Sequence, residues 1–164
     1  MYSIKVATTT EIPIIQTLVE QIWRPTYQSL LTSAQIDYMI DMMYSTASLT
    51  RQLEELQHQY ILLYDETVPI GYASYSTTDT AGIFKLHKIY LHMSYQGKGV
   101  GKLLMNSVIE KVKALNAHIL ELDVNRDNMA RLFYEKQGFT IYKEKDTDIG
   151  NGYLMNDYVM RKPL

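Results

Sequence analysis

The 164-residue sequence contains no cysteine, and its charges nearly balance, with a formal net charge of -2. The absence of cysteine excludes disulfide bonds, cysteine-ligated metals and a cysteine nucleophile, and it fits a reducing environment such as the cytoplasm. The 16 basic and 18 acidic residues are mixed along the chain. Because they offer no large basic surface for a polyanion, nucleic acid is not an expected partner.

Long hydrophobic runs, internal repeats and low-complexity tracts are also missing. No apolar stretch approaches the roughly 20 residues that a membrane span requires, and the first residues lack the basic and apolar segments of a secretory signal. With 46% hydrophobic residues, the chain is long enough for one well-buried core and short for two. We therefore expect a soluble, cytoplasmic protein without a membrane partner, folded as a single domain over residues 1–164.

Hydrophobic periodicity predicts alternating strands and helices. Strands are expected at residues 4–8, 60–65, 69–76, 84–93, 119–124, 140–145 and 152–162. Helices are expected from Pro13 to near Pro25, over residues 33–58 with a break near 45–48, up to about Leu115, and over residues 127–137. Thr8 and Glu11 have the spacing of a capping box, Ser33 is a candidate cap, and Gly138 is a candidate left-handed stop. This order is typical of an α/β fold.

Glycine is scarce, with 8 in the chain, yet residues 94–102 read SYQGKGVGK and precede a helical pattern. The segment does not match a dinucleotide fingerprint, because Lys102 stands where the third glycine belongs. It does not match a Walker loop either, because Gln96 replaces the first glycine and Leu103 follows the lysine. A glycine turn that leads into a helix N-terminus can still bind phosphate through its backbone N–H groups. The alternative is a tight turn without a ligand.

Two motifs together carry a resemblance to a known family. Residues 96–101 match the pattern QxxGxG, and ARLFYEKQGF at residues 130–139 matches AxxFYxxxGF about 30 residues later. In these motifs and in its layout the chain resembles the GNAT family of acetyl-CoA-dependent N-acetyltransferases. The segment KIYLHMSYQGKGVGKLL is in addition similar to the spermidine/spermine N-acetyltransferase branch of that family.

The resemblance implies an α/β fold with a mixed central sheet of about seven strands flanked by helices. Two of the strands are expected to splay apart and admit coenzyme A. It implies an enzyme with acetyl-CoA as cosubstrate and no metal. The residues that it assigns to coenzyme A are Ile89, Tyr90, Leu91, Gln96, Gly97, Lys98, Gly99, Val100, Gly101, Lys102, Asn125, Asn128 and Tyr134. For Asn125 and Asn128, capping of the following helix is an equal alternative.

Transfer of an acetyl group to an amine needs few side chains. An alkyl amine with a pKa near 10.4 is mostly protonated at pH 7, so a base or a water chain must remove a proton. The departing thiolate needs an acid, and the motif position of Tyr134 resembles that of the family's general acid. For the base, His87 and Asp123 are candidates beside water alone, and His87 stands where relatives often carry glutamate.

The acceptor is expected to be the primary amine of a small molecule, with a polyamine favoured, or a peptide or protein N-terminus. Its specificity is expected to depend on Trp23, Tyr27, Asp37, Tyr38, Asp41 and residues 146–157. Carboxylates and aromatic faces there would suit a polyamine, although ordinary surface charge explains the same residues. A homodimer is one possible assembly. Two alternatives are a catalytically silent protein that senses acetyl-CoA and an interaction module that binds no cofactor.

Overall fold

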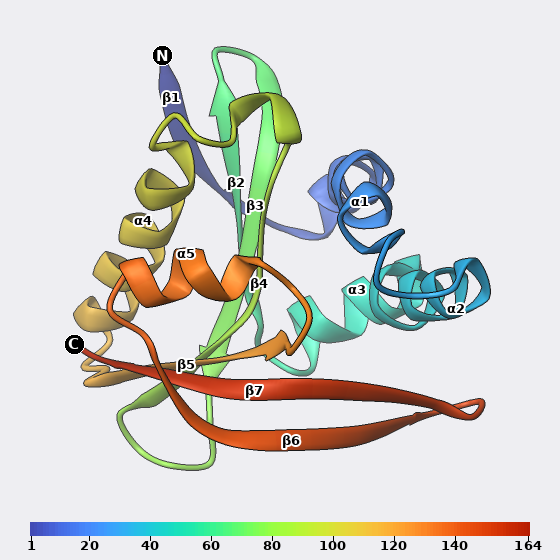
Figure 1. Cartoon of the computed structure of the whole chain (residues 1–164). Helices are drawn as coiled ribbons and strands as arrows, with labels where there is room; N and C mark the ends of the chain where they lie inside the picture. The colour runs from blue at the N-terminus through green and yellow to red at the C-terminus, as the bar shows by residue number, and fades with distance from the viewer. The chain divides into compact units, whose positions relative to one another are not determined.

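The seven strands and five α-helices of the chain are seen in a computed structural model that describes all 164 residues (Figure 1). The strands follow the sheet order β1-β2-β3-β4-β5-β7-β6, with parallel and antiparallel pairs. The predicted α/β class and the mixed sheet of about seven strands are therefore confirmed. None of the helices is long and apolar enough to cross a membrane.

Two compact units make up the chain. The N-terminal unit consists of Met1–Ser76 and Lys88–Val108, and the C-terminal unit consists of Thr77–His87 and Ile109–Leu164. Strand β4 (Ile83–Leu91) and helix α4 (Val100–Ala114) contribute residues to both units.

Three antiparallel strands form the sheet of the N-terminal unit: β1 (Tyr2–Ala7), β2 (Gln59–Asp65) and β3 (Val68–Thr77). Strands β2 and β3, both predicted from the sequence, form a hairpin. Its two-residue turn places Glu66 at a φ of 52°, the left-handed conformation that tight hairpins require. Both faces of β2 are buried over Tyr60–Tyr64, so this strand lies in the core.

Helix α1 (Ile12–Tyr27) begins after the predicted capping box. The backbone N–H of Thr8 donates to Oε2 of Glu11 over 2.7 Å, and the Thr8 hydroxyl oxygen accepts from the N–H of Thr10 over 3.3 Å. These bonds pair donors that a helix start otherwise leaves unsatisfied. They hold a 3-10 turn, Thr9–Glu11, that leads directly into α1.

The predicted end of α1 near Pro25 is two residues early, because the helix continues to Tyr27. A proline lacks the N–H of one intrahelical bond, but the last turn closes around it. The Thr26 hydroxyl donates to the Ile22 carbonyl over 2.7 Å, and the Gln28 N–H donates to the Arg24 carbonyl over 3.0 Å.

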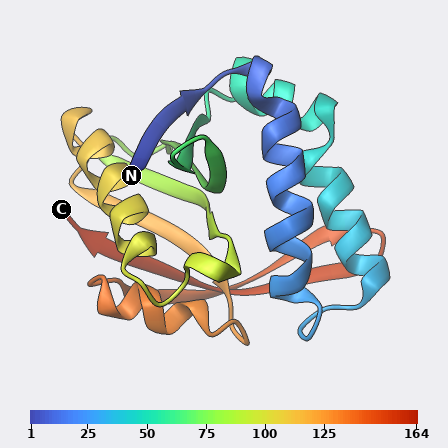
Figure 2. The same cartoon turned by 90° about the horizontal axis from the view of Figure 1, so that it is seen from above.

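The predicted break in the next helical region is confirmed. Helix α2 (Ser33–Tyr44) ends before Ser45, whose hydroxyl oxygen caps α3 (Thr46–Glu54) by accepting from the N–H of Ser48. The cap of α2 is Thr32 and not the predicted Ser33, because the Thr32 hydroxyl oxygen accepts from the Gln35 N–H. Helices α1 and α2 lie side by side (Figure 2).

In the C-terminal unit, the first residues of β4 pair in parallel with β5 (Ile119–Asn125), and β5 pairs antiparallel with β7 (Tyr153–Pro163). Strand β6 (Thr140–Gly150) forms a long hairpin with β7 (Figure 1). The predicted strand over residues 140–145 was too short, because backbone pairing with β7 extends through mostly polar residues. The hairpin closes at Asn151 and Gly152, which have φ values of 56° and 78°.

Alternation along β5 gives the C-terminal sheet two different faces. Leu120, Leu122 and Val124 are buried, whereas the polar residues between them are half-buried on the opposite face. Helix α5 (Ala130–Lys136) starts three residues later than predicted, because residues 126–129 form a connection with turns. Gly138 stops it with a φ of 94°, as predicted.

Candidate functional site

The glycine loop lies in the N-terminal unit, between β4 and the start of α4. Gly97 and Gly99 have φ values of 75° and 78°, a conformation that L side chains rarely adopt. A Cβ atom built on either glycine would meet no other atom within 4 Å. The two glycines are therefore required by backbone conformation, and the space next to them is open.

Helix α4 begins directly after this loop, at Val100. The N–H of Leu103 donates to the Gly99 carbonyl over 3.2 Å, whereas the N–H groups of Val100, Gly101 and Lys102 lie in the first turn and have no acceptor within the helix. Their donors and the positive end of the helix dipole favour an anion. One face of the helix, with apolar residues four apart, packs in the core and is at most 2% exposed: Val100, Leu104, Val108 and Val112.

Side chains of the preceding residues hold the loop in place. The predicted strand over residues 84–93 ends at Leu91, because Met93–Tyr95 form a 3-10 turn capped by the His92 ring, whose Nδ1 accepts from the Ser94 N–H. The Gln96 side-chain amide donates to the Leu91 carbonyl over 3.2 Å. Lys98 extends over the Tyr95 ring, with its Nζ 5.9 Å from the ring centroid.

The end of β4, Ile89–Leu91, is where the resemblance places the pantetheine arm. This strand approaches β3 closely at Gly71, where a Cβ atom would lie 2.8 Å from the Tyr90 carbonyl oxygen. Alternation along β4 puts Lys88 and Tyr90 on one face, and both contact buried tyrosines of the same unit. His87 directly precedes Lys88 on β4; it belongs to the C-terminal unit and is half-buried.

Five tyrosines of the N-terminal unit form a tyrosine cluster next to the end of β4. Its members are Tyr27, Tyr44, Tyr60, Tyr72 and Tyr90. The hydroxyl groups of Tyr44 and Tyr72 are 2.8 Å apart, and those of Tyr27 and Tyr90 are 3.0 Å apart. Burial is the main reason that the pKa of Tyr44 and that of Tyr72 are raised well above the ordinary value. Both phenols therefore stay protonated.

Lys88 adds a positive charge to the tyrosine cluster. Its Nζ lies 5.3 Å from the ring centroid of Tyr44 and 5.6 Å from that of Tyr60. It donates to the Gln52 side-chain oxygen over 3.2 Å, an oxygen that also accepts from the Tyr60 hydroxyl over 2.5 Å. The sequence did not single out Lys88 or Gln52 as site residues.

Some of the residues of α1 and α2 that were predicted to set specificity for the acetyl acceptor have partners within the fold. Trp23 is buried and its ring centroid lies 4.3 Å from that of Tyr27. Asp37 forms an ion pair with Arg24, with Oδ1 and the guanidinium nitrogen 2.8 Å apart. That carboxylate therefore already has a cationic partner.

Tyr134 lies on α5 in the C-terminal unit and is half-buried. Its ring packs edge-on against Phe133 and Phe139, with centroids 5.7 and 6.0 Å away. The side-chain oxygens of Asn125 and Asn128 accept from the backbone N–H groups of Asp127 and Ala130, each over 2.9 Å. Asn128 thus pairs the N–H of the first residue of α5, whereas the Asn125 bond closes a turn before the helix. Met129, directly before α5, makes no side-chain cap bond.

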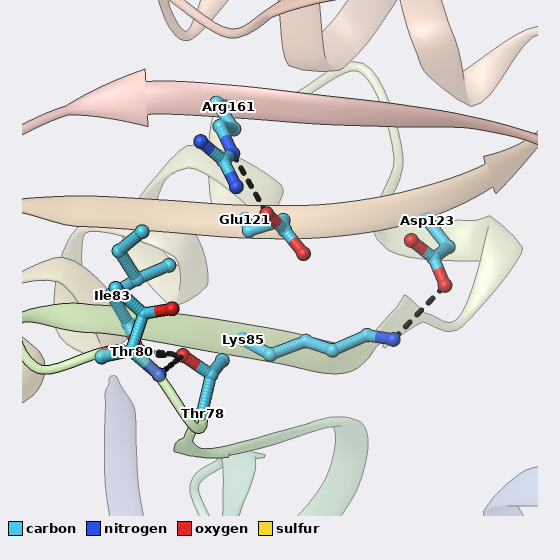
Figure 3. Close-up of polar contacts among 7 residues, drawn as sticks. All are labelled: Thr78, Thr80, Ile83, Lys85, Glu121, Asp123 and Arg161. Atoms are coloured by element: carbon cyan, nitrogen blue, oxygen red, sulfur yellow. Dashed lines mark hydrogen bonds and ion pairs between the residues drawn. The ribbon is translucent and has the colours of Figure 1, made fainter. Parts of the chain in front are cut away.

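Asp123 lies on the polar face of β5 between two lysines. Its Oδ2 accepts from Lys85 over 2.9 Å, as Figure 3 shows, and from Lys145 over 3.1 Å. Burial alone would raise the pKa of Asp123, but the charges and hydrogen bonds of the two lysines outweigh it and lower the pKa below the ordinary value. On the same face, Arg161 of β7 pairs with Glu121 over 2.7 Å (Figure 3).

Asp157 on β7 lies at the end of the range 146–157 that the sequence named for acceptor specificity, but sequence reasoning did not single it out. Only 3% of it is exposed. Burial, reinforced by the negative charge of Asp123, raises its pKa to about 6. A signal was present, because residues 153, 155, 157 and 159 share one face of the strand and Asp157 is the one charged residue among Tyr, Met and Val.

The loop and strand residues assigned to coenzyme A lie in the N-terminal unit, and His87, Asp123, Asn125, Asn128 and Tyr134 lie in the C-terminal unit. No group of three or more histidine, aspartate or glutamate side chains is arranged to hold a metal ion.

Residues 28–162 match the family model described as an acetyltransferase (GNAT) domain. Over 85 residues the chain is 38% identical to a ribosomal protein bS18-alanine N-acetyltransferase of Haemophilus influenzae, covering 51% of this chain and 53% of that protein. Over 95 residues it is 27% identical to an L-methionine sulfoximine/L-methionine sulfone acetyltransferase of Salmonella typhimurium, covering 56% and 54%. The chain thus spans about half the length of the curated relatives that it matches.

Among solved structures, the PaiA N-acetyltransferase of Thermoplasma acidophilum in complex with coenzyme A has a similar fold. Its TM-score is 0.82 at 22% identity, with 100% of this chain and 99% of that chain covered. At that identity the likeness supports the fold alone. Because the family model covers most of the chain, this protein belongs to the GNAT family of acetyltransferases.

Proposed function

We propose that this protein is an N-acetyltransferase that moves the acetyl group of acetyl-CoA to a primary amine. The observation that carries the proposal is the loop at residues 96–99, with two glycines at positive φ directly before the N-terminus of α4. Such a turn presents backbone donors to a phosphate group without side-chain obstruction.

The loop would bind the diphosphate of coenzyme A. The open space beside Gly97 and Gly99 leaves room for phosphate oxygens, and the N–H groups of Val100, Gly101 and Lys102 supply donors. The exposed side chains of Lys98 and Lys102 add positive charge. Ile89–Leu91 would pair with the pantetheine arm, and the bound thioester would supply the acetyl group.

Tyr134 is the proposed acid that protonates the departing thiolate. A phenol with an ordinary pKa near 10 and a thiol with a pKa near 8.5 are closely enough matched for this transfer. His87 and Asp123 are the proposed bases, with water as the alternative. The lowered pKa of Asp123 makes it the weaker acceptor of a proton from an amine.

The acceptor class is supported by the names of two relatives and by the charges in the N-terminal unit. Two relatives that match in sequence are named for an alanine of ribosomal protein bS18 and for L-methionine sulfoximine and sulfone. Lys88 gives the tyrosine cluster a positive charge, and Asp37 is paired with Arg24. Both features weigh against a polycation, and so against the polyamine that the sequence favoured. They favour an amino acid or a peptide N-terminus as the acceptor.

Two assays test the proposal. Thermal unfolding with increasing acetyl-CoA should raise the melting temperature, because a ligand that binds only the folded state stabilises it by mass action. Thiol release should then be measured with L-methionine sulfone, spermidine and an alanine-led hexapeptide. Stabilisation without release from any acceptor would point to a silent acetyl-CoA sensor, and no stabilisation would contradict the proposal.

A further inference from the structure

Asp157, one of a pair of carboxylates on the polar face of the C-terminal sheet, has no role in the function proposed above. Asp157 of β7 lies opposite Asn125 of β5, and Asp123 lies opposite Val159. Asp123 and Asp157 are therefore diagonal neighbours on one face, a relationship that places Cβ atoms about 7 Å apart. Side chains at this distance can interact directly or through one water molecule.

The charged groups around Asp157 come from four segments of the chain. Lys85 approaches from β4, Asp123 from β5, Arg126 from the turn after β5 and Lys145 from β6. The two lysines both engage Oδ2 of Asp123, and Oδ1 of Asp123 is buried without a hydrogen-bond partner. A buried acceptor of this kind is costly unless a donor reaches it. A protonated Asp157 carboxyl group is a donor on the same face.

We propose that Asp157 accepts the proton that the acceptor amine must lose, with Asp123 as the ionised neighbour that stabilises the protonated form. This inference rests on the proposed acetyl transfer. The ammonium group gives one proton to the Asp157 carboxylate, either through Asp123 or through water. The neutral amine then forms the new C–N bond as the C–S bond breaks, its second proton ends on the thiolate, and Asp157 releases the first to solvent.

The titration of Asp157 fits this role. A general base works best when its pKa lies near the operating pH. Burial and the charge of Asp123 raise the pKa of Asp157 to about 6, so its carboxylate is mostly ionised at pH 7 and binds a proton about a hundredfold more tightly than an ordinary aspartate. The lysines hold Asp123 ionised, so the proton rests on Asp157.

A titration without substrate tests the protonation itself. The chain labelled with ¹³C at the aspartate carboxyl groups should show one signal with a midpoint near pH 6, and this signal should be missing from Asp157→Asn. A midpoint below about pH 4.5 for that signal would overturn the proposal.

Kinetics test the role in transfer. The reaction is measured for acetyl-CoA with L-methionine sulfone, spermidine or an alanine-led hexapeptide. Below pH 6, kcat/KM of the wild type should fall by a factor of ten more per pH unit than kcat/KM of Asp157→Asn. Asp157→Asn should lack this limb, and its kcat at pH 7.5 should fall at least tenfold with the KM for acetyl-CoA unchanged. Asp79→Asn, which removes the same charge from an exposed connection, should behave as the wild type.

Lys145→Met keeps the proposal testable if Asp157→Asn does not fold. Lys145 lowers the pKa of Asp157 and is 40% exposed, so its loss should move the ¹³C midpoint and the kinetic limb to higher pH by the same amount. If the wild type acetylates one of these acceptors and Asp157→Asn keeps the wild-type pH profile, or if the two shifts differ, this inference alone is wrong. If the wild type acetylates none of them, the proposed function fails, and this inference fails with it.

Discussion

The hydroxyl groups of Tyr44 on α2 and Tyr72 on β3 lie 2.8 Å apart, and both side chains are buried. Removal of one hydroxyl leaves the other as a buried group without this partner, which costs about 1–3 kcal/mol. Tyr44→Phe and Tyr72→Phe should therefore each destabilise the fold.

The double variant tests the coupling between these two tyrosines. Because it removes both polar groups at once, its loss should be smaller than the sum of the single losses by about 1 kcal/mol. Denaturant unfolding of the four proteins measures this difference. Strictly additive losses would show that the two hydroxyl groups do not support each other.

Gly99→Val should weaken the binding of coenzyme A by about tenfold or more, because the substitution strains a residue at positive φ and places side-chain atoms in the open space of the loop. Gly152→Val is the matched control. Gly152 has the same φ of 78° and the same open surroundings, but it lies in the β6–β7 turn. Calorimetry should find normal affinity for the control, and equal losses in both variants would argue against the phosphate role of the loop.

Tyr134→Phe should lower kcat on the order of 100-fold while the affinity for acetyl-CoA stays nearly constant, because only the transferable proton is removed. Tyr142→Phe removes the hydroxyl of an exposed tyrosine on β6 and retains the ring that Arg161 covers. Steady-state kinetics of both variants give the comparison. An unchanged kcat for Tyr134→Phe would remove its role as acid.

Asp157 should make the stability of the wild type fall as the pH rises. Its pKa is raised on folding to about 6, so the folded state binds the proton more tightly than the unfolded state. The stabilisation is fully present below the unfolded pKa near 3.9 and is lost as the pH rises through about 6. Between pH 4 and pH 8, the free energy of unfolding of Asp157→Asn should gain about 2 kcal/mol relative to the wild type. Parallel curves for the two proteins would contradict the raised pKa.

Local features of the sequence were predictable. The glycine loop, the capping box at Thr8 and the stop at Gly138 depend on a few adjacent residues, and each was found where expected. Boundaries were less accurate where neighbouring groups decide them. The last turn of α1 accommodates Pro25, and the asparagine turns delay the start of α5.

Features that depend on strand order were not predictable. The charged environment of Asp157 arises because β7 lies between β5 and β6 in the sheet, so residues distant in sequence become neighbours. The contact of Lys88 with Tyr44 and Tyr60 likewise joins β4 to α2 and β2. Alternation along a strand puts Lys88 and Tyr90 on one face of β4, but it does not identify the side chains that face them.

The central claim is that backbone N–H groups of residues 97–102 bind the diphosphate of coenzyme A. An amide ¹H–¹⁵N NMR titration with coenzyme A, compared with pantetheine, which lacks the diphosphate, tests it most directly. Coenzyme A should shift the amide signals of Gly97, Gly99 and Gly101 strongly and to saturation, and pantetheine should leave them in place. The claim is contradicted if coenzyme A leaves these three signals unmoved or if pantetheine shifts them equally.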